Sequence, residues 1–278
     1  MCSLSILKTI LLVILAANTL AFFNIAFKPL RFYSRVAVYI FLMMITAIYG
    51  FIASAFLALI GKRGLGQWTT ARAFYALCSV ILGVKIEVRN EEILKTRPAV
   101  FLSNHQSELD ILILGRSFPQ WCSVTAKKSL KYYPFLGWFM TMSSTVFVDR
   151  GNRNNAFKAF DSAAKKMNDE KQSVFMFPEG TRSYFQTPDL LPFKKGAFHL
   201  AIQAKVPIVP FVTCNYAHVL DLKKKRFEPG TIIIEVLKPV STENKTSADV
   251  NDMVEEVRNS MLTCVKKLGK EAESDKTK

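Results

Sequence analysis

The chain has 278 residues, of which 50% are hydrophobic and only 21% are charged. This balance excludes an intrinsically disordered chain and is unusual for a freely soluble domain, so membrane contact is the first hypothesis. Lysine and arginine outnumber aspartate and glutamate by 37 to 22, which gives a net charge of +15. The partners are therefore expected to be anionic, and anionic lipid or a polyphosphate substrate suits an apolar chain better than nucleic acid does.

Two long uncharged segments lie near the N-terminus. Residues 36–60 contain no charged side chain, and this run exceeds the roughly 20 residues needed to cross a hydrocarbon core of about 30 Å. Residues 10–27 form a second uncharged run, and the link at 28–35 carries positive charges beside aromatics suited to a headgroup boundary. We predict a two-helix membrane hairpin within residues 1–67, and hence an integral or monotopic membrane protein. Positive residues flank both runs, so charge asymmetry leaves the topology open.

A cleaved signal peptide is the alternative for about the first 20 residues, because Lys8 precedes an apolar stretch there. Its charged region is thin, and a second, longer apolar run follows it. The membrane anchor is therefore the favoured interpretation.

The composition changes at Glu87, the first acidic residue of the chain. We place a globular domain over residues 68–268, opening with an interfacial helix at 68–84 that is too short to span a membrane. A charged tail over 269–278 is expected to fray. Helical patterns lie at 156–167 and 250–265. Short runs rich in valine, isoleucine and phenylalanine predict buried strands at 84–88, 99–103, 122–125, 145–148, 174–177, 208–213 and 231–236. This alternation predicts an α/β fold whose central sheet, mostly parallel or mixed, is flanked by helices.

His105 is the first candidate for chemistry, because it follows a predicted strand and precedes an apolar run that reads as a helix. Sites in α/β folds tend to lie at such strand ends. In a regular helix, residues five apart would be about 140° from each other. His105 and Asp110 can therefore meet only if His105 lies in the turn and Asp110 in the first helical turn. Such a pair would make a general base, whereas an aspartate that complements the helix dipole is the structural alternative.

A second candidate site, at residues 177–183, also follows a predicted strand. Gly180 allows close backbone approach to a ligand, Thr181 can donate a hydrogen bond, and Arg182 offers a planar fork for phosphate or carboxylate. The pattern is consistent with an anion cradle. A turn in which Glu179 and Arg182 face solvent is the alternative.

Other features carry less weight. The lysine-rich runs at 126–131 and 223–226 are typical of solvated faces, although they could also meet lipid headgroups or CoA phosphates. The five cysteines are scattered and lack any C-x-x-C spacing, so neither a disulfide framework nor a metal site is predicted. No nucleic-acid recognition motif accompanies the basic charge, so no nucleic-acid partner is expected.

Four motifs occur in a characteristic order: NHQSELD at 104–110, VDRGNR at 148–153, FPEGTRS at 177–183 and VPIVPFV at 206–212. Together they closely resemble the four motifs of the glycerolipid acyltransferase family, over residues 86–236. The resemblance implies transfer of a fatty acyl group from acyl-CoA to the sn-2 hydroxyl of lysophosphatidic acid, which gives phosphatidic acid. It also implies that acyl-CoA is a co-substrate and that neither a cofactor nor a metal is needed.

The resemblance also implies residue roles. His105 would be the general base, and Asp110 would fix the tautomer of its imidazole. The acceptor site would use Glu179, Gly180, Thr181 and Arg182, with Arg182 pairing with the phosphate and with Arg150 or Lys195 adding charge. The expected partners are acyl-CoA, lysophosphatidic acid and membrane lipids, at the endoplasmic reticulum membrane of a eukaryote or at a lipid droplet.

Three alternatives remain open on the sequence. A related acyltransferase could use glycerol 3-phosphate or another lysophospholipid as the acceptor. A non-catalytic membrane protein could bind anionic lipid through its basic face. A lipid hydrolase could apply the same histidine and aspartate to water.

Overall fold

The computed structural model describes residues 12, 28–149 and 151–274. The strands are β1 (Val84–Arg89), β2 (Val100–Ser103), β3 (Cys122–Lys127), β4 (Val146–Val148), β5 (Ser173–Met176), β6 (Ile208–Thr213), β7 (Leu220–Asp221), β8 (Arg226–Phe227) and β9 (Gly230–Val236). Seven of them form one sheet in the order β1-β9-β6-β2-β5-β3-β4, while β7 and β8 pair separately. Within the sheet, β6 and β9 are antiparallel and the other neighbours are parallel. The predicted mixed, mostly parallel sheet is confirmed.

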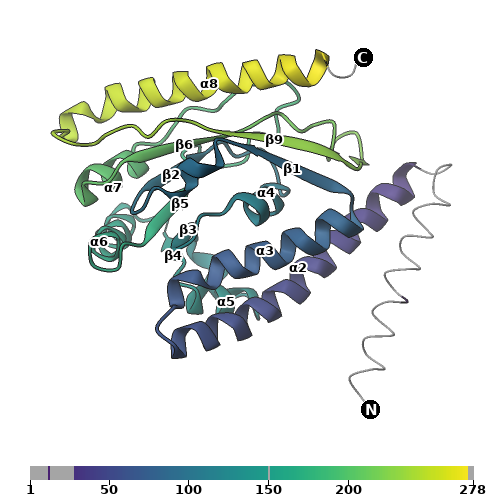
Figure 1. Ribbon diagram of the computed structural model, residues 1–278, viewed down its shortest axis with the longest axis horizontal. Helices are drawn as coiled ribbons and strands as arrows, with labels where there is room; N and C mark the ends of the chain where they lie inside the picture. The colour runs from purple at the N-terminus through teal and green to yellow at the C-terminus, as the bar shows by residue number, and fades with distance from the viewer. Residues whose placement is uncertain (1–11, 13–27, 150, 275–278) are drawn as a thin grey trace.

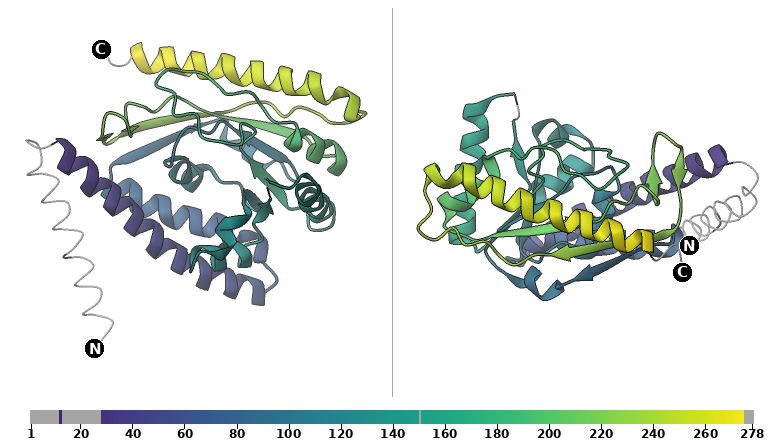
Figure 2. Two further views of the ribbon diagram at one scale, coloured as in Figure 1. Left: turned by 180° about the vertical axis from the view of Figure 1, so that it is seen from behind. Right: turned by 90° about the horizontal axis from the view of Figure 1, so that it is seen from above.

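Helices cover both faces of the sheet. The α-helices are α2 (Lys28–Leu59), α3 (Gly66–Ile81), α4 (Asp110–Ser117), α5 (Leu136–Met142), α6 (Arg153–Asp169), α7 (Gly196–Ala204) and α8 (Val250–Ser274). Figure 1 shows α8 along one face, and α4, α3 and α2 stacked outward from the other. The same layers are seen from behind and from above in Figure 2. The structure is therefore a sheet enclosed by helices, with α2 as the outermost element.

The centre of the sheet is apolar on both of its faces. Every residue of β2, β5 and β6 is buried, as expected for parallel strands covered on both sides. The Phe175 ring lies 6.4 Å from that of Phe101 and 5.5 Å from that of Phe211 between centroids. Because β2 and β5 are parallel neighbours with Val100 opposite Val174, the loops that follow them leave the same edge of the sheet. This edge holds both candidate sites.

The N-terminal membrane segment differs from the prediction in one respect. The link expected at 28–35 is helical, because α2 begins at Lys28 and runs without a break to Leu59. Proline is tolerated in the first turn of a helix, so Pro29 does not interrupt it. The first predicted apolar helix, residues 10–27, lies outside the described residues apart from Leu12. The two-helix hairpin therefore stays a prediction.

Helix α3 corresponds to the short apolar helix predicted at 68–84, but it begins at Gly66 and ends at Ile81. Its inner face, including Phe74 and Cys78, is buried between α2 and α4. On its outer face Val80 is 84% exposed. The helix is thus part of the core on one side only.

The tail expected to fray from Gly269 is helical as far as Ser274. Leu268 is fully buried, and the backbone of Gly269 packs closely on Pro188, where a β-carbon would collide. Beyond the glycine, Glu271 accepts a hydrogen bond of 2.6 Å from Arg89 of β1. These tertiary contacts hold a segment whose composition alone suggested disorder.

Candidate active site

The structure brings His105 and Asp110 together. His105 lies in the turn after β2, and Asp110 is the first residue of α4. The His105 Nδ1 atom is 2.7 Å from Asp110 Oδ2. This is the arrangement that the five-residue spacing required, since the two side chains could not meet within one regular helix.

Asp110 is held by further hydrogen bonds from its own turn. Its Oδ2 atom accepts from the backbone N–H groups of Gln106 at 2.7 Å and Ser107 at 3.2 Å. Its Oδ1 atom accepts from the hydroxyl of Tyr216 at 2.7 Å. The carboxylate is 3% exposed, so its orientation is set by these donors and not by solvent.

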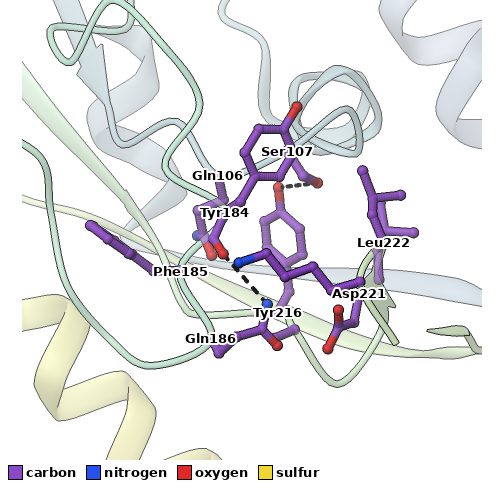
Figure 3. Close-up of a pocket in the computed structure, with 11 residues that line it drawn as sticks. Gln106, Ser107, Tyr184, Phe185, Gln186, Tyr216, Asp221 and Leu222 are labelled. Carbon is purple, nitrogen blue, oxygen red and sulfur yellow. Dashed lines mark hydrogen bonds between the residues drawn. The ribbon is translucent and has the colours of Figure 1, made fainter. Parts of the chain in front are cut away.

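Tyr216 was not found by sequence analysis. It is fully enclosed by the protein, and its hydroxyl also lies 2.9 Å from the Ser107 hydroxyl; Figure 3 shows the two side chains pointing toward each other. Burial raises the pKa of Tyr216 well above its ordinary value, which keeps the phenol protonated and able to donate. A lone tyrosine more than a hundred positions from Asp110 carries no sequence signal for this contact.

The other side of the His105 ring is apolar. The ring stacks on Phe177, the last residue before the second candidate turn, with centroids 4.0 Å apart and planes 18° apart. The His105 side chain is 17% exposed. With Nδ1 engaged by Asp110, the Nε2 atom is the ring nitrogen left for a substrate.

The backbone at the end of β2 is also locked to a neighbouring strand. The Asn104 amide donates to the carbonyl of Thr213 at 2.9 Å and accepts from its N–H at 2.9 Å. Asn104 is buried, and its two bonds tie the turn to the end of β6. Sequence analysis quoted this residue only as part of a motif.

Both carboxylate oxygens of Glu179 accept hydrogen bonds from backbone N–H groups. Its Oε1 atom accepts from the backbone N–H of His105 at 2.7 Å, and its Oε2 atom accepts from that of Leu191 at 3.0 Å. The side chain is 3% exposed, and burial raises its pKa from 4.5 to about 7. These bonds place Glu179 to hold the turn that carries His105, and the acceptor-site role that the resemblance implies stays a prediction.

The second candidate turn is compact and glycine-dependent. The Gly180 N–H donates to the Phe177 carbonyl at 3.1 Å. Gly180 has a φ of +71°, and a β-carbon there would lie 2.7 Å from the Lys194 ammonium nitrogen. The positive φ therefore favours glycine at this position. Thr181, on the other side of the turn, is exposed.

Arg182 extends from this turn toward the first one. Its Nη1 atom lies 3.1 Å from Glu108 Oε1, which also accepts from the Tyr184 hydroxyl at 2.7 Å. The backbone joins the two turns as well, since the Ser183 N–H donates to the His105 carbonyl at 2.9 Å. Within the described part of the chain, Arg182 Nε has no hydrogen-bond partner. The Arg182 side chain is 38% exposed beside the His105 turn, but its Nε atom is itself buried.

Lys195 and Arg150 were the two other cationic residues predicted to add charge to the site. Lys195 is exposed at the start of α7, whereas its neighbour Lys194 is the lysine that lies over Gly180. Arg150 lies outside the described residues.

A cavity of about 250 Å³ lies behind the turn, lined in part by Gln106, Ser107, Tyr184 and Tyr216 (Figure 3). Its walls come from the His105 turn, the loop after Arg182 and the β7–β8 hairpin. His105 itself is not part of its lining. The cavity therefore neighbours the reactive ring without containing it.

None of the cysteines in the described part of the chain is an exposed thiol. The four within the described ranges are free and buried. Burial raises the pKa of Cys214 to about 11 and those of Cys78 and Cys264 to about 12. Among the same described residues, no group of three or more histidine, cysteine, aspartate or glutamate side chains is arranged to hold a metal ion.

Comparison with known proteins gives consistent relatives. The family model described as Acyltransferase matches residues 85–213. The 1-acyl-sn-glycerol-3-phosphate acyltransferase of Saccharomyces cerevisiae is 48% identical over 221 residues, which cover 80% of this chain and 73% of that protein. The human 1-acyl-sn-glycerol-3-phosphate acyltransferase beta is 34% identical over 242 residues, covering 85% of this chain and 84% of that protein.

A solved structure has the same fold. The crystal structure of the 1-acyl-sn-glycerophosphate (LPA) acyltransferase PlsC from Thermotoga maritima superposes with a TM-score of 0.64, covering 88% of this chain and 98% of that one at 24% identity. At this identity the likeness concerns the fold alone, and the sequence relatives carry the assignment. This chain therefore belongs to the acyltransferase family represented by these 1-acyl-sn-glycerol-3-phosphate acyltransferases.

Proposed function

We propose that this protein transfers a fatty acyl group from acyl-CoA to the sn-2 hydroxyl of lysophosphatidic acid and so makes phosphatidic acid. The observation that carries the proposal is the contact of 2.7 Å between His105 and Asp110, beside a turn that presents Arg182. The relatives reported above are named for this acceptor, 1-acyl-sn-glycerol 3-phosphate.

His105 acts as the general base. An alcohol is a poor nucleophile at neutral pH, so the imidazole removes the hydroxyl proton through Nε2 as the oxygen attacks the thioester carbonyl carbon. Asp110 holds the Nδ1 proton, which fixes the tautomer and stabilises the imidazolium that forms. The donors on Asp110 keep the carboxylate aimed at the ring.

The same imidazole completes the reaction. The tetrahedral intermediate collapses by breaking the carbon–sulfur bond, and the imidazolium returns its proton to the departing CoA sulfur. The new ester stays on the glycerol, so the acyl group is never attached to the enzyme. This route is consistent with the raised thiol pKa values of the buried cysteines.

Arg182 and Lys194 bind the phosphate of the acceptor. Arg182 presents a planar guanidinium on a side chain that is 38% exposed, and Lys194 places its ammonium over Gly180. Guanidinium and ammonium groups suit a phosphate monoester, as a fork and as a point charge respectively. Glu179 supports the reaction indirectly, by holding the backbone of His105.

Helix α2 lies along the bilayer surface and does not by itself span the bilayer. It is the candidate membrane span among the described residues, over Pro29–Leu59. Buried side chains from Phe32 to Ser54 attach it to the domain. At 1.5 Å per residue, the helix between these two residues is about 33 Å long. Its outward face is an apolar stripe: Ile40, Met44, Ile48, Ile52, Phe56 and Leu59. A helix packed on one side and apolar on the other suits the membrane interface.

This geometry also couples the membrane to the site, because the Tyr39 hydroxyl of α2 donates to the Glu108 carbonyl at 2.9 Å. The acyl chains can remain in apolar surroundings while the glycerol hydroxyl reaches His105 at headgroup level. In a eukaryotic cell, we place the protein at the endoplasmic reticulum membrane or at a lipid droplet, whose monolayer an interfacial helix can also enter.

The acceptor assay tests the proposal. Purified protein is given one acyl-CoA with lysophosphatidic acid, glycerol 3-phosphate or lysophosphatidylcholine, and product formation is measured for each. We expect turnover with lysophosphatidic acid to exceed the other two. Preference for either of the others would overturn the acceptor assignment, and release of fatty acid without acceptor would identify a hydrolase.

A further inference from the structure

A cluster of exposed aromatic side chains lies on the catalytic domain and away from the His105 turn. It comprises Tyr132, Tyr133, Phe135 and Trp138, which are 74%, 57%, 48% and 50% exposed; we call it the aromatic patch. Its residues come from a 3₁₀ turn at Lys128–Tyr132 and from α5 and the connection between them. Large aromatic rings are rarely left in water together without a partner.

The aromatic patch is strained as well as exposed. Phe135 has a φ of +59°, a conformation that is an outlier for a bulky residue. Since the ring is half exposed, burial within the chain does not offset this strain. Such outliers persist where the surrounding structure imposes them, and they concentrate at functional surfaces.

The aromatic patch is continuous with the apolar stripe of α2. The rings of Trp138 and Phe51 are 6.0 Å apart, and Phe51 lies three residues after Ile48 of the stripe, a spacing that makes them neighbours on the helix surface. The Phe139 ring packs against Gly50, where it lies 2.8 Å from the position of a β-carbon. Figure 1 shows α5 beside one end of α2, on the outer side of the sheet. A bilayer that receives the stripe would therefore meet the aromatic patch as well.

The segment that carries the aromatic patch contains basic residues and no acidic ones. No acidic residue occurs between Asp110 and Asp149. Lys127 and Lys131 are exposed there, while Lys128 pairs with Asp149 at 3.5 Å. Aromatic rings beside lysines match the headgroup level of a membrane that carries anionic lipid.

We infer that the aromatic patch is a second membrane contact, one that docks the catalytic domain itself on the headgroup region of an anionic bilayer. This inference rests on the membrane association proposed above. With α2, it gives two lines of attachment, which would fix the tilt of the domain as well as its depth.

Tryptophan fluorescence tests the inference. The full-length protein is placed in vesicles of phosphatidylcholine and phosphatidic acid with brominated acyl chains, which quench rings that enter the membrane. We expect Trp138→Phe to reduce the quenched fraction of the emission. The matched control is Trp121→Phe, which removes a ring that lies 4.7 Å from the Arg97 guanidinium and should raise that fraction, because it removes unquenched emission only. Equal quenching in wild type and Trp138→Phe would overturn the inference.

The lysines provide a second readout. We expect Lys127→Gln and Lys131→Gln each to lower partition into phosphatidic acid vesicles by about fivefold and to leave partition into pure phosphatidylcholine unchanged. Lys165→Gln, an exposed position on α6, is the control. Equal loss in both vesicle types, or none, would contradict an anionic-lipid contact.

Three further outcomes separate this inference from its rivals. If the protein transfers acyl groups in detergent but Trp138 is not quenched in the brominated vesicles, the proposed function stands and the membrane contact is overturned. If Trp138 is quenched but no acyl transfer is measured, the membrane contact stands and the proposed function is overturned. A change of oligomeric state in Trp138→Ala, measured by light scattering, with no loss of quenching would identify the aromatic patch as an interface between copies and overturn the inference.

Discussion

The turn after β2 and the turn after β5 leave the sheet side by side, but they hold their charged groups differently. In the first turn, the Asp110 carboxylate is buried and receives hydrogen bonds from the turn and from Tyr216. In the second turn, the Arg182 side chain is 38% exposed and pairs with Glu108, whose side chain is 40% exposed. The first turn therefore holds the Asp110 carboxylate in one orientation, whereas the second presents a partly exposed positive charge.

Glu179 shows how the two turns depend on each other. It belongs to the second turn by sequence, but its carboxylate binds the backbone N–H of His105 in the first. A carboxylate that looks like a ligand-binding group in the motif is therefore a brace. The division of labour can be tested by substituting one residue of each kind.

His105→Ala should have the largest effect on catalysis. Without the base, we expect kcat to fall by about 10²- to 10⁴-fold, because the acceptor hydroxyl must lose its proton without help. Steady-state rates with lysophosphatidic acid and acyl-CoA measure the loss. His199→Ala, a half-buried position on α7, is the control and should keep its rate. Full activity in His105→Ala would remove the first turn from the mechanism.

Glu179→Ala should mainly affect stability. It leaves two buried backbone N–H groups without an acceptor, at about 1–3 kcal/mol each, so we expect the free energy of unfolding to drop by about 2–6 kcal/mol. Denaturant titration in detergent micelles measures this drop. A stable variant with a raised KM for lysophosphatidic acid would instead make Glu179 a substrate ligand.

The raised pKa of Glu179 also predicts a pH dependence. Its value of about 7 exceeds the ordinary 4.5, so between these values the folded protein keeps a proton that the unfolded chain has lost. The contribution of Glu179 to stability should therefore decline as pH rises from 4.5 to 7. Melting temperatures across this range should show a steeper decline in wild type than in Glu179→Gln. Parallel curves would contradict the assignment.

Arg182→Ala should raise the KM for lysophosphatidic acid by about tenfold or more, since it removes a charge-assisted contact to the phosphate. The KM for acyl-CoA should change little. Arg182→Lys keeps the charge without the fork and should fall between wild type and alanine. The opposite pattern, with the acyl-CoA KM raised, would move Arg182 to the donor site.

Tyr216→Phe should have the smallest effect, a fall in kcat of about tenfold, because Asp110 keeps its backbone donors and loses one hydroxyl. We expect the KM values to hold and the pH–rate profile to shift, since the carboxylate that orients His105 has lost a donor. Tyr75→Phe, whose hydroxyl accepts from the Ile86 N–H at 3.3 Å, is the control. An unchanged pH–rate profile would make Tyr216 merely structural.

Much of the fold could be predicted from the sequence, because its strands are short continuous runs of apolar residues. All seven strands of the main sheet lie where these runs predicted them, within two residues at each end. The β7–β8 hairpin was missed because strands of two residues carry no pattern. The helical segment of α8 beyond Gly269 was not predicted, because Pro188 and Arg89, which contact it, lie far away in the chain.

The active-site turn was predictable for a related reason. His105 and Asp110 are close in sequence, and a strand end followed by a helix start leaves few ways for them to meet. Their partners were not predictable, because Tyr216, Thr213 and Glu179 reach this turn only when β5, β6 and β2 align. The strands and the His105 turn followed from the apolar runs in the sequence. The polar contacts of the site, and the partial exposure of Arg182, depended on packing between strands that are distant in sequence.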